Sequence, residues 1–198
     1  MTDDQDRSTF SLNARTGALV LSVSAPLNLI LHMQGARLGP LSYAVWLGVS
    51  FGILCFCEEM GPSKPLNRAG LILFAGAFCA DTVATLAVDP NLVARAHLLY
   101  AFATLGALVL WSVALMHRTK IAKAVGSVGA AVGGGALVLL VAAHLLLGTA
   151  TILGFSQLYA TLDESGQSTF GALAMIDSIL CVWSLSISVL LWNVRLRD

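Results

Sequence analysis

Residues 93–116 read VARAHLLYAFATLGALVLWSVALM, an apolar segment in which Arg95 is the only Lys, Arg, Asp or Glu. An α-helix rises about 1.5 Å per residue, so this segment is long enough to cross the hydrocarbon core of a bilayer, which is about 30 Å thick. Five further apolar segments lie at 16–33, 41–57, 69–88, 125–149 and 169–193, of which the first two are short. We therefore predict an all-α, polytopic membrane protein built as a bundle of six transmembrane helices.

The composition of the 198-residue chain agrees with this prediction and excludes other classes. Hydrophobic residues make up 57% of the chain and charged residues 11%, whereas soluble domains contain about 25% charged residues. Strands of a membrane barrel would alternate polar and apolar residues over about ten positions, and the sequence shows no such alternation. The net charge is zero, so the chain has no basic patch for nucleic acid. We expect the lipid bilayer as a partner and no nucleic acid.

The distribution of Lys and Arg predicts how the bundle is oriented, because basic loops stay in the cytoplasm. With six spans, only Arg37 and Arg95 fall on one side. The other side receives the remaining basic residues, which are Arg7, Arg15, Lys64, Arg68, Arg118, Lys120, Lys123, Arg195 and Arg197. We predict both termini in the cytoplasm (N-in, C-in) and a location in the plasma or inner membrane. Residues 1–15 would be a short polar cytoplasmic tail, and 16–198 a single transmembrane domain.

Most predicted loops are short, which favours antiparallel packing of neighbouring helices. The fifth loop, at about 150–168, is the exception. Its apolar residues Ile152, Phe155, Tyr159 and Leu162 share one helical face. This pattern predicts a helix that lies in the outer interface of the membrane.

The predicted outer half of the membrane contains five ionisable side chains from five different spans. They are His32, Asp81, His97, His144 and Asp177. Histidine costs little near the interface, but each aspartate costs about 2.5–3.5 kcal/mol near the centre of a span. Such residues mark ligand sites, ion pathways or structural pairs, so we take all five as candidates for ligand or metal binding.

Polar residues at helical spacing extend this constellation. The supporting positions that we single out are Asn28, Thr85, Tyr100 and Thr104 within the spans, with Arg37 and Arg95 at the outer surface. Polar stripes in lipid face the interior of a bundle or a cavity. We predict a polar cavity lined by every span except the second, which has no such stripe and is expected at the periphery.

Three kinds of function fit these residues. The first is a redox or metalloenzyme subunit that binds haem b or a divalent metal. In the haem version His97 and His144 are the axial ligands, and Arg37 and Arg95 hold the propionates; in the metal version imidazole and carboxylate groups are the ligands. The second is a small-substrate or proton-coupled transporter that uses Asp81 and Asp177. The third is a non-catalytic assembly or regulatory protein. Whether the protein is an enzyme is left open.

Two short patterns have more ordinary interpretations. Gly129 and Gly133 form a GxxxG motif, which lets another helix approach closely; we interpret it as helix packing within the bundle, with a homo-oligomer or larger complex as the alternative. Glu58 and Glu59 begin the EExxxR pattern of CAAX-type membrane proteases, but Ser63 stands at the arginine position. We interpret both glutamates as solvated acids at a helix end.

Overall fold

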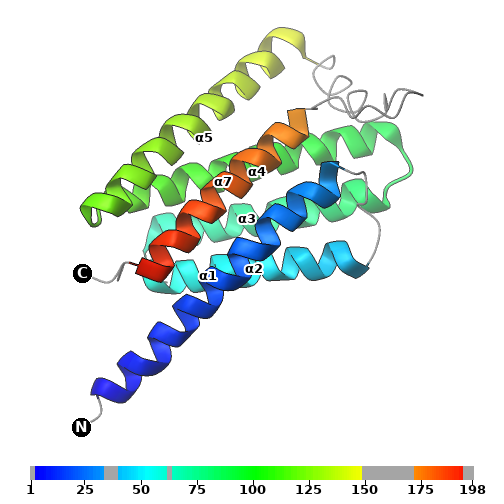
Figure 1. Cartoon of the computed structure of the whole chain (residues 1–198). Coiled ribbons are helices and arrows are strands. Elements are labelled where there is room, and N and C mark those ends of the chain that lie inside the picture. The colour runs from blue at the N-terminus through cyan, green and yellow to red at the C-terminus, as the bar shows by residue number, and fades with distance from the viewer. Residues whose placement is uncertain (1–2, 34–39, 62–63, 149–171, 194–198) are drawn as a thin grey trace.

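The computed structural model describes residues 3–33, 40–61, 64–148 and 172–193, and the regular structure in these ranges is entirely α-helical. The helices are α1 (Asp3–Met33), α2 (Pro40–Met60), α3 (Pro65–Leu86), α4 (Pro90–Leu115), α5 (Lys120–Leu147) and α7 (Ala172–Asn193) (Figure 1). All six are long and apolar enough to cross a membrane, which confirms the prediction of a multi-pass membrane protein. The predicted interfacial helix at 150–168 lies outside the described residues.

The first helix is longer than the sequence analysis predicted. It begins at Asp3 and runs for 31 residues, so most of the predicted tail at 1–15 is helical. The reason is local, because residues 3–16 contain neither glycine nor proline, the two residues that most disfavour a helix. The apolar window that suits a membrane begins only at Asn13.

Helix α4 is the centre of the bundle. It packs along α3 on one side and along α5 on another, while α1 packs against both α2 and α7 (Figure 1). The α3–α4 turn is stabilised by Asp89, whose side chain accepts a hydrogen bond from the backbone N–H of Asn91 at 3.0 Å. The end of the bundle that holds Lys64, Arg118, Lys120 and Lys123 is called the basic end below.

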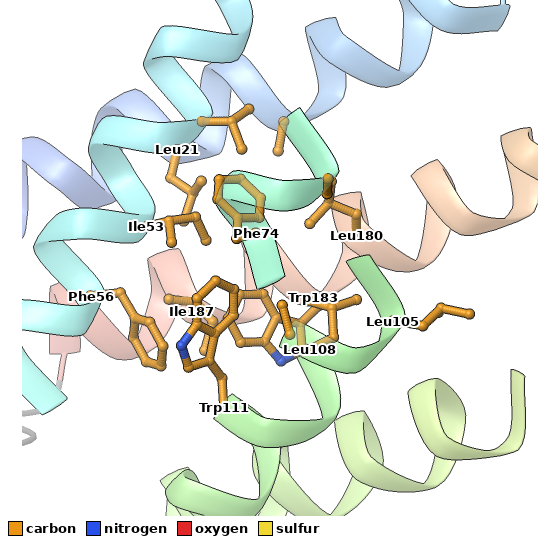
Figure 2. Close-up of a cluster of buried hydrophobic side chains, with 14 of the residues drawn as sticks. Leu21, Ile53, Phe56, Phe74, Leu105, Leu108, Trp111, Leu180, Trp183 and Ile187 are labelled. Carbon is orange, nitrogen blue, oxygen red and sulfur yellow. The ribbon is translucent and has the colours of Figure 1, made fainter. Parts of the chain in front are cut away.

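A cluster of aromatic rings fills the bundle between α2, α3, α4 and α7. Trp111 and Trp183 stack with ring centroids 5.5 Å apart, and Phe56 meets Trp183 edge-on, also at 5.5 Å (Figure 2). The ring centroids of Trp46 and Phe74 are 5.6 Å apart. Aromatic pairs of this kind contribute about 0.5–1.5 kcal/mol each beyond the area that they bury.

Two of these rings, Trp46 and Phe56, come from α2, so the prediction that the second span lies at the periphery is wrong. Half of the α2 span is buried in the bundle, against 17% of the α5 span. A stripe of polar residues indicates an inward face, but its absence does not indicate an outward helix, because large apolar side chains also fill a bundle interior. The helix at the periphery is α5.

Glycines set the spacing between three pairs of helices. In α2, Gly52 lies against Leu21 of α1. In α5, Gly129 lies against Ser112 of α4 and Trp183 of α7, and Gly133 lies against Val109 of α4. A glycine at such a place lets two membrane helices approach closely, since it has no side chain to separate them.

The last turn of α2 is tied to the basic end by side chains from two other elements. Asn67 of α3 donates from its amide nitrogen to the carbonyl oxygens of Cys57 and Gly61, at 2.7 and 3.1 Å. Arg118 donates to the carbonyl oxygen of Met60 at 2.7 Å. These bonds satisfy carbonyl groups that have no partner within the helix itself. Glu59, expected to be solvated, is buried in this packed end.

Replacing Asn67 with alanine is expected to lower the free energy of unfolding by about 1–3 kcal/mol, because the buried carbonyl oxygen of Cys57 then loses the amide donor of Asn67. The measurement is thermal unfolding of purified protein in one detergent. Asn193→Ala is the matched control, since this residue is exposed and its amide donates to the carbonyl oxygen of Val189 in its own helix. Equal unfolding midpoints for the two variants would contradict the prediction.

Candidate functional site: a buried tyrosine–aspartate pair

The centre of the candidate site is a hydrogen bond between α4 and α7. Tyr100 donates from its hydroxyl group to Oδ1 of Asp177 at 2.5 Å. Both side chains are shielded, with 0% and 1% of their surfaces exposed. A length near 2.5 Å is typical of a hydroxyl group that donates to a carboxylate, which is stronger than a hydrogen bond between neutral groups.

Helical periodicity places both residues on inward faces. His97, Tyr100 and Thr104 follow at intervals of three and four on α4, and all three are buried. On α7, Asp177 begins a second buried stripe that continues through Cys181, Ser184 and Ser188. The polar residues of these two spans were predicted to face the interior of the bundle, and the burial of the residues in both stripes confirms it.

Two polar atoms beside the pair are buried and have no hydrogen-bond partner within the described part of the chain. They are Nε1 of Trp46 and Oγ1 of Thr104. The Trp46 ring lies edge-on to Tyr100 at 6.3 Å, and Thr104 is one helical turn along α4 from Tyr100. A buried polar atom without a partner costs about 1–3 kcal/mol, and such atoms usually bind water, an ion or a polar ligand. The surroundings of Tyr100 are therefore suited to hold a small polar species.

Asp81 and His97 lie on the neighbouring faces of α3 and α4. Both are buried, with 8% and 5% of their surfaces exposed. The contact of Gly106 with Leu73 sets the antiparallel register of the two helices. Counting eight residues from this contact toward the α3–α4 turn leads from Leu73 to Asp81 on α3 and from Gly106 to Leu98 on α4. Asp81 is therefore level with the segment of α4 that contains His97 and Tyr100. The carboxyl group of Asp81 and the imidazole of His97 therefore lie at the same depth in the bundle as the Tyr100–Asp177 pair.

The two histidines proposed as haem ligands lie on different sides of α4. His144 of α5 is half-buried and meets the ring of Phe102 edge-on at 6.4 Å. Phe102 and His97 are five residues apart, so their side chains project about 140° apart around α4. The structure therefore does not bring His97 and His144 together as axial ligands would have to be.

The remaining predicted residues are dispersed. Asn28 is buried on α1, Thr85 is half-buried on α3, and Arg95 is exposed on α4. His32 falls in the last turn of α1, but its side chain is not described, and Arg37 lies outside the described residues. Within the described residues, no three His, Cys, Asp or Glu side chains gather closely enough to hold a metal ion.

Trp46 is the residue of the site that the sequence analysis missed. No stripe of polar residues accompanies Trp46 in its apolar span. The residue type was nevertheless informative, because tryptophan has a polar N–H group. A tryptophan that is buried in a membrane helix usually needs a partner for its N–H group, whereas leucine at the same place does not. Trp46 is thus the contribution of α2 to the site.

Comparison of the chain with protein-family models, curated proteins and solved structures finds no match.

Proposed function

We propose that this protein binds protons at the Tyr100–Asp177 pair and moves them, alone or with a small solute, through the half of the bundle that lies away from the basic end. The observation that carries the proposal is the buried hydrogen bond between the Tyr100 hydroxyl and the Asp177 carboxyl group. Ionisable residues inside membrane spans are costly, and in pumps and transporters they form proton relays.

The groups around the pair support a relay rather than an isolated structural bond. Asp81 and His97 share its depth and are themselves buried, so four groups able to accept or donate a proton lie in one segment of the bundle. Trp46 and Thr104 offer further hydrogen-bonding atoms next to Tyr100. A carboxyl group in such surroundings passes a proton through hydroxyl or imidazole neighbours, which both donate and accept.

The orientation that we propose follows from the charge bias. Basic residues at the ends of membrane helices favour the cytoplasm, so the basic end faces inward and the Tyr100–Asp177 pair lies in the outer half. The plasma or inner membrane is the location that suits a protein of this kind.

Asp177→Asn is expected to remove a proton-binding group that infrared spectroscopy detects. In the wild type, a change of pH should convert a carboxylate band into the band of a protonated carboxylic acid. Asparagine fits the same space and cannot ionise, so the part of this signal that arises from Asp177 should be lost. In vesicles with an enclosed pH-sensitive dye and an imposed membrane potential, Asp177→Asn and Asp81→Asn should both reduce proton flux to that of protein-free vesicles.

Asp89→Asn is the matched control for both measurements. Asp89 is exposed at the start of α4, and asparagine caps a helix about as well as aspartate does. This variant should keep the buried carboxyl signal and the flux. The proposal fails if the infrared signal of Asp177→Asn equals that of the wild type, or if wild-type vesicles conduct no faster than empty ones.

Binding of a metal or haem is the second candidate. Asp81, Asp177 and His97 are buried and are suitable ligand types for zinc or iron, but within the described residues they do not gather closely enough to hold one ion together. Absorption and elemental analysis of purified protein test this candidate. A Soret band or one metal ion per chain would favour it over the proton relay.

A further inference from the structure

An apolar groove runs along the surface between α5 and α7, apart from the Tyr100–Asp177 pair. Its volume is about 490 Å³, and Leu108 of α4 and Trp183 of α7 contribute to its lining. From α5 it is lined by Ala124, Val125, Val128, Gly129 and Val132, and from α7 by Ser178, Ile179, Val182 and Ser186. Val128 and Val182 are each 65% exposed, so the groove opens to the surroundings of the bundle, which in a membrane are lipid.

The side-chain donors among the lining residues of the groove are already engaged within the protein. The hydroxyl groups of Ser178 and Ser186 donate to carbonyl oxygens of their own helix, at 2.7 and 2.9 Å. The indole N–H of Trp183 donates to Oγ of Ser112 at 3.1 Å. With these donors already engaged, the groove recognises its occupant by shape and apolar contact.

The length of the groove suits part of an extended chain. On α5 it extends from Ala124 to Val132, which is about 12 Å at 1.5 Å per residue. A single acyl chain is extended and apolar, and it can lie along a groove of this length and lining.

One end of the groove carries a positive charge. Lys120 lies one helical turn before Ala124, the residue that lines this end of the groove on α5. Lys120 is exposed at the basic end. Neither α5 nor the part of α7 that reaches this end contains an aspartate or glutamate. A phosphate group at this place would meet a cation, and no acid of α5 or of the described part of α7 near this end would compete with it.

We propose that the groove between α5 and α7 binds one acyl chain of an anionic phospholipid, whose phosphate group is held by Lys120. The apolar walls take the chain, and the lysine selects the headgroup. A bound lipid would cover the exposed side of α5, the helix that the rest of the bundle covers least.

Native mass spectrometry of the purified full chain tests the proposal, with phosphatidylglycerol and phosphatidylcholine added in equal amounts. The wild type should retain one phosphatidylglycerol per chain in preference to phosphatidylcholine. Val128→Trp fills the groove and should abolish retention of either lipid. Val138→Trp is the matched control, because Val138 is exposed on α5 outside the groove, and it should behave as the wild type.

Lys120→Gln separates the headgroup contact from the acyl-chain contact. It should reduce the preference for phosphatidylglycerol by about fivefold, the usual effect of one basic residue near an anionic membrane surface. Lys123→Gln is the control with the same change of charge, since Lys123 projects from the side of α5 opposite the residues that line the groove. Equal retention of both lipids by the wild type would overturn the proposal. So would unchanged retention in Val128→Trp, or a wild-type dimer that Val128→Trp dissociates, because a second copy would then cover the groove.

Discussion

Replacing Gly126 with leucine is expected to separate α5 from α4 and to lower the free energy of unfolding by about 3 kcal/mol, the upper part of the range for overpacked sites. A Cβ atom at this position would lie 2.5 Å from the carbonyl oxygen of Ser112 and 3.0 Å from the backbone nitrogen of Met116. Both obstacles are backbone atoms, so no rotation of a side chain relieves the overlap. The helices must move apart, and the packing of Gly129 and Gly133 on α4 is lost with them.

Gly134→Leu is the control for this prediction. Gly134 lies in the same helix, and a Cβ atom there would meet nothing within 4 Å. The substitution also removes a glycine from a helix interior, which is worth about 0.5–1 kcal/mol in favour of the folded state. Thermal unfolding of both variants in one detergent should therefore show a large loss for Gly126→Leu and no loss for Gly134→Leu. Equal losses would mean that α5 does not pack on α4 through Gly126.

Tyr100→Phe is expected to destabilise the fold more than the double substitution Tyr100→Phe with Asp177→Leu. The single change leaves the buried Asp177 carboxyl group without the donor that lies 2.5 Å away, and a charged group in that situation costs more than about 1–3 kcal/mol. The double change removes both polar partners, and replacement by apolar groups of similar shape is often nearly neutral.

A double-mutant cycle measures this coupling, with unfolding of the wild type, both single variants and the double variant under one condition. The expected coupling energy is about 1–2 kcal/mol, at the upper end of measured values for hydrogen bonds between membrane helices. Tyr43→Phe controls for the loss of a hydroxyl group alone, because Tyr43 is 37% exposed. A coupling energy near zero would indicate that the bond between Tyr100 and Asp177 does not hold α4 and α7 together.

Much of the candidate site followed from periodicity. The stripes that begin at His97 on α4 and at Asp177 on α7 were predicted to face inward, because polar groups avoid lipid. The particular partnership of Tyr100 with Asp177 was not predicted. Two stripes that both face inward can meet in several ways, and only the relative rotation and height of α4 and α7 decide which hydroxyl group reaches which carboxyl group.

The proposed pairing of His97 with His144 shows the same dependence on tertiary structure. Both lie at similar predicted depths, but depth says nothing of the direction in which a side chain points around its helix. Phe102 contacts His144 of α5, and His97 projects about 140° away from Phe102 around α4.

The sequence by itself determined the number of spans, the all-helical class and the inward faces of the polar helices. These follow from free energies of transfer between water and hydrocarbon, which depend on the side chains of one segment at a time. Only the tertiary structure decided that α2 and its Trp46 lie inside and that α5 lies outside. Lipid tails are as apolar as leucine, so hydrophobicity does not rank apolar helices by burial; close packing of rings and glycines does, and that depends on several helices together.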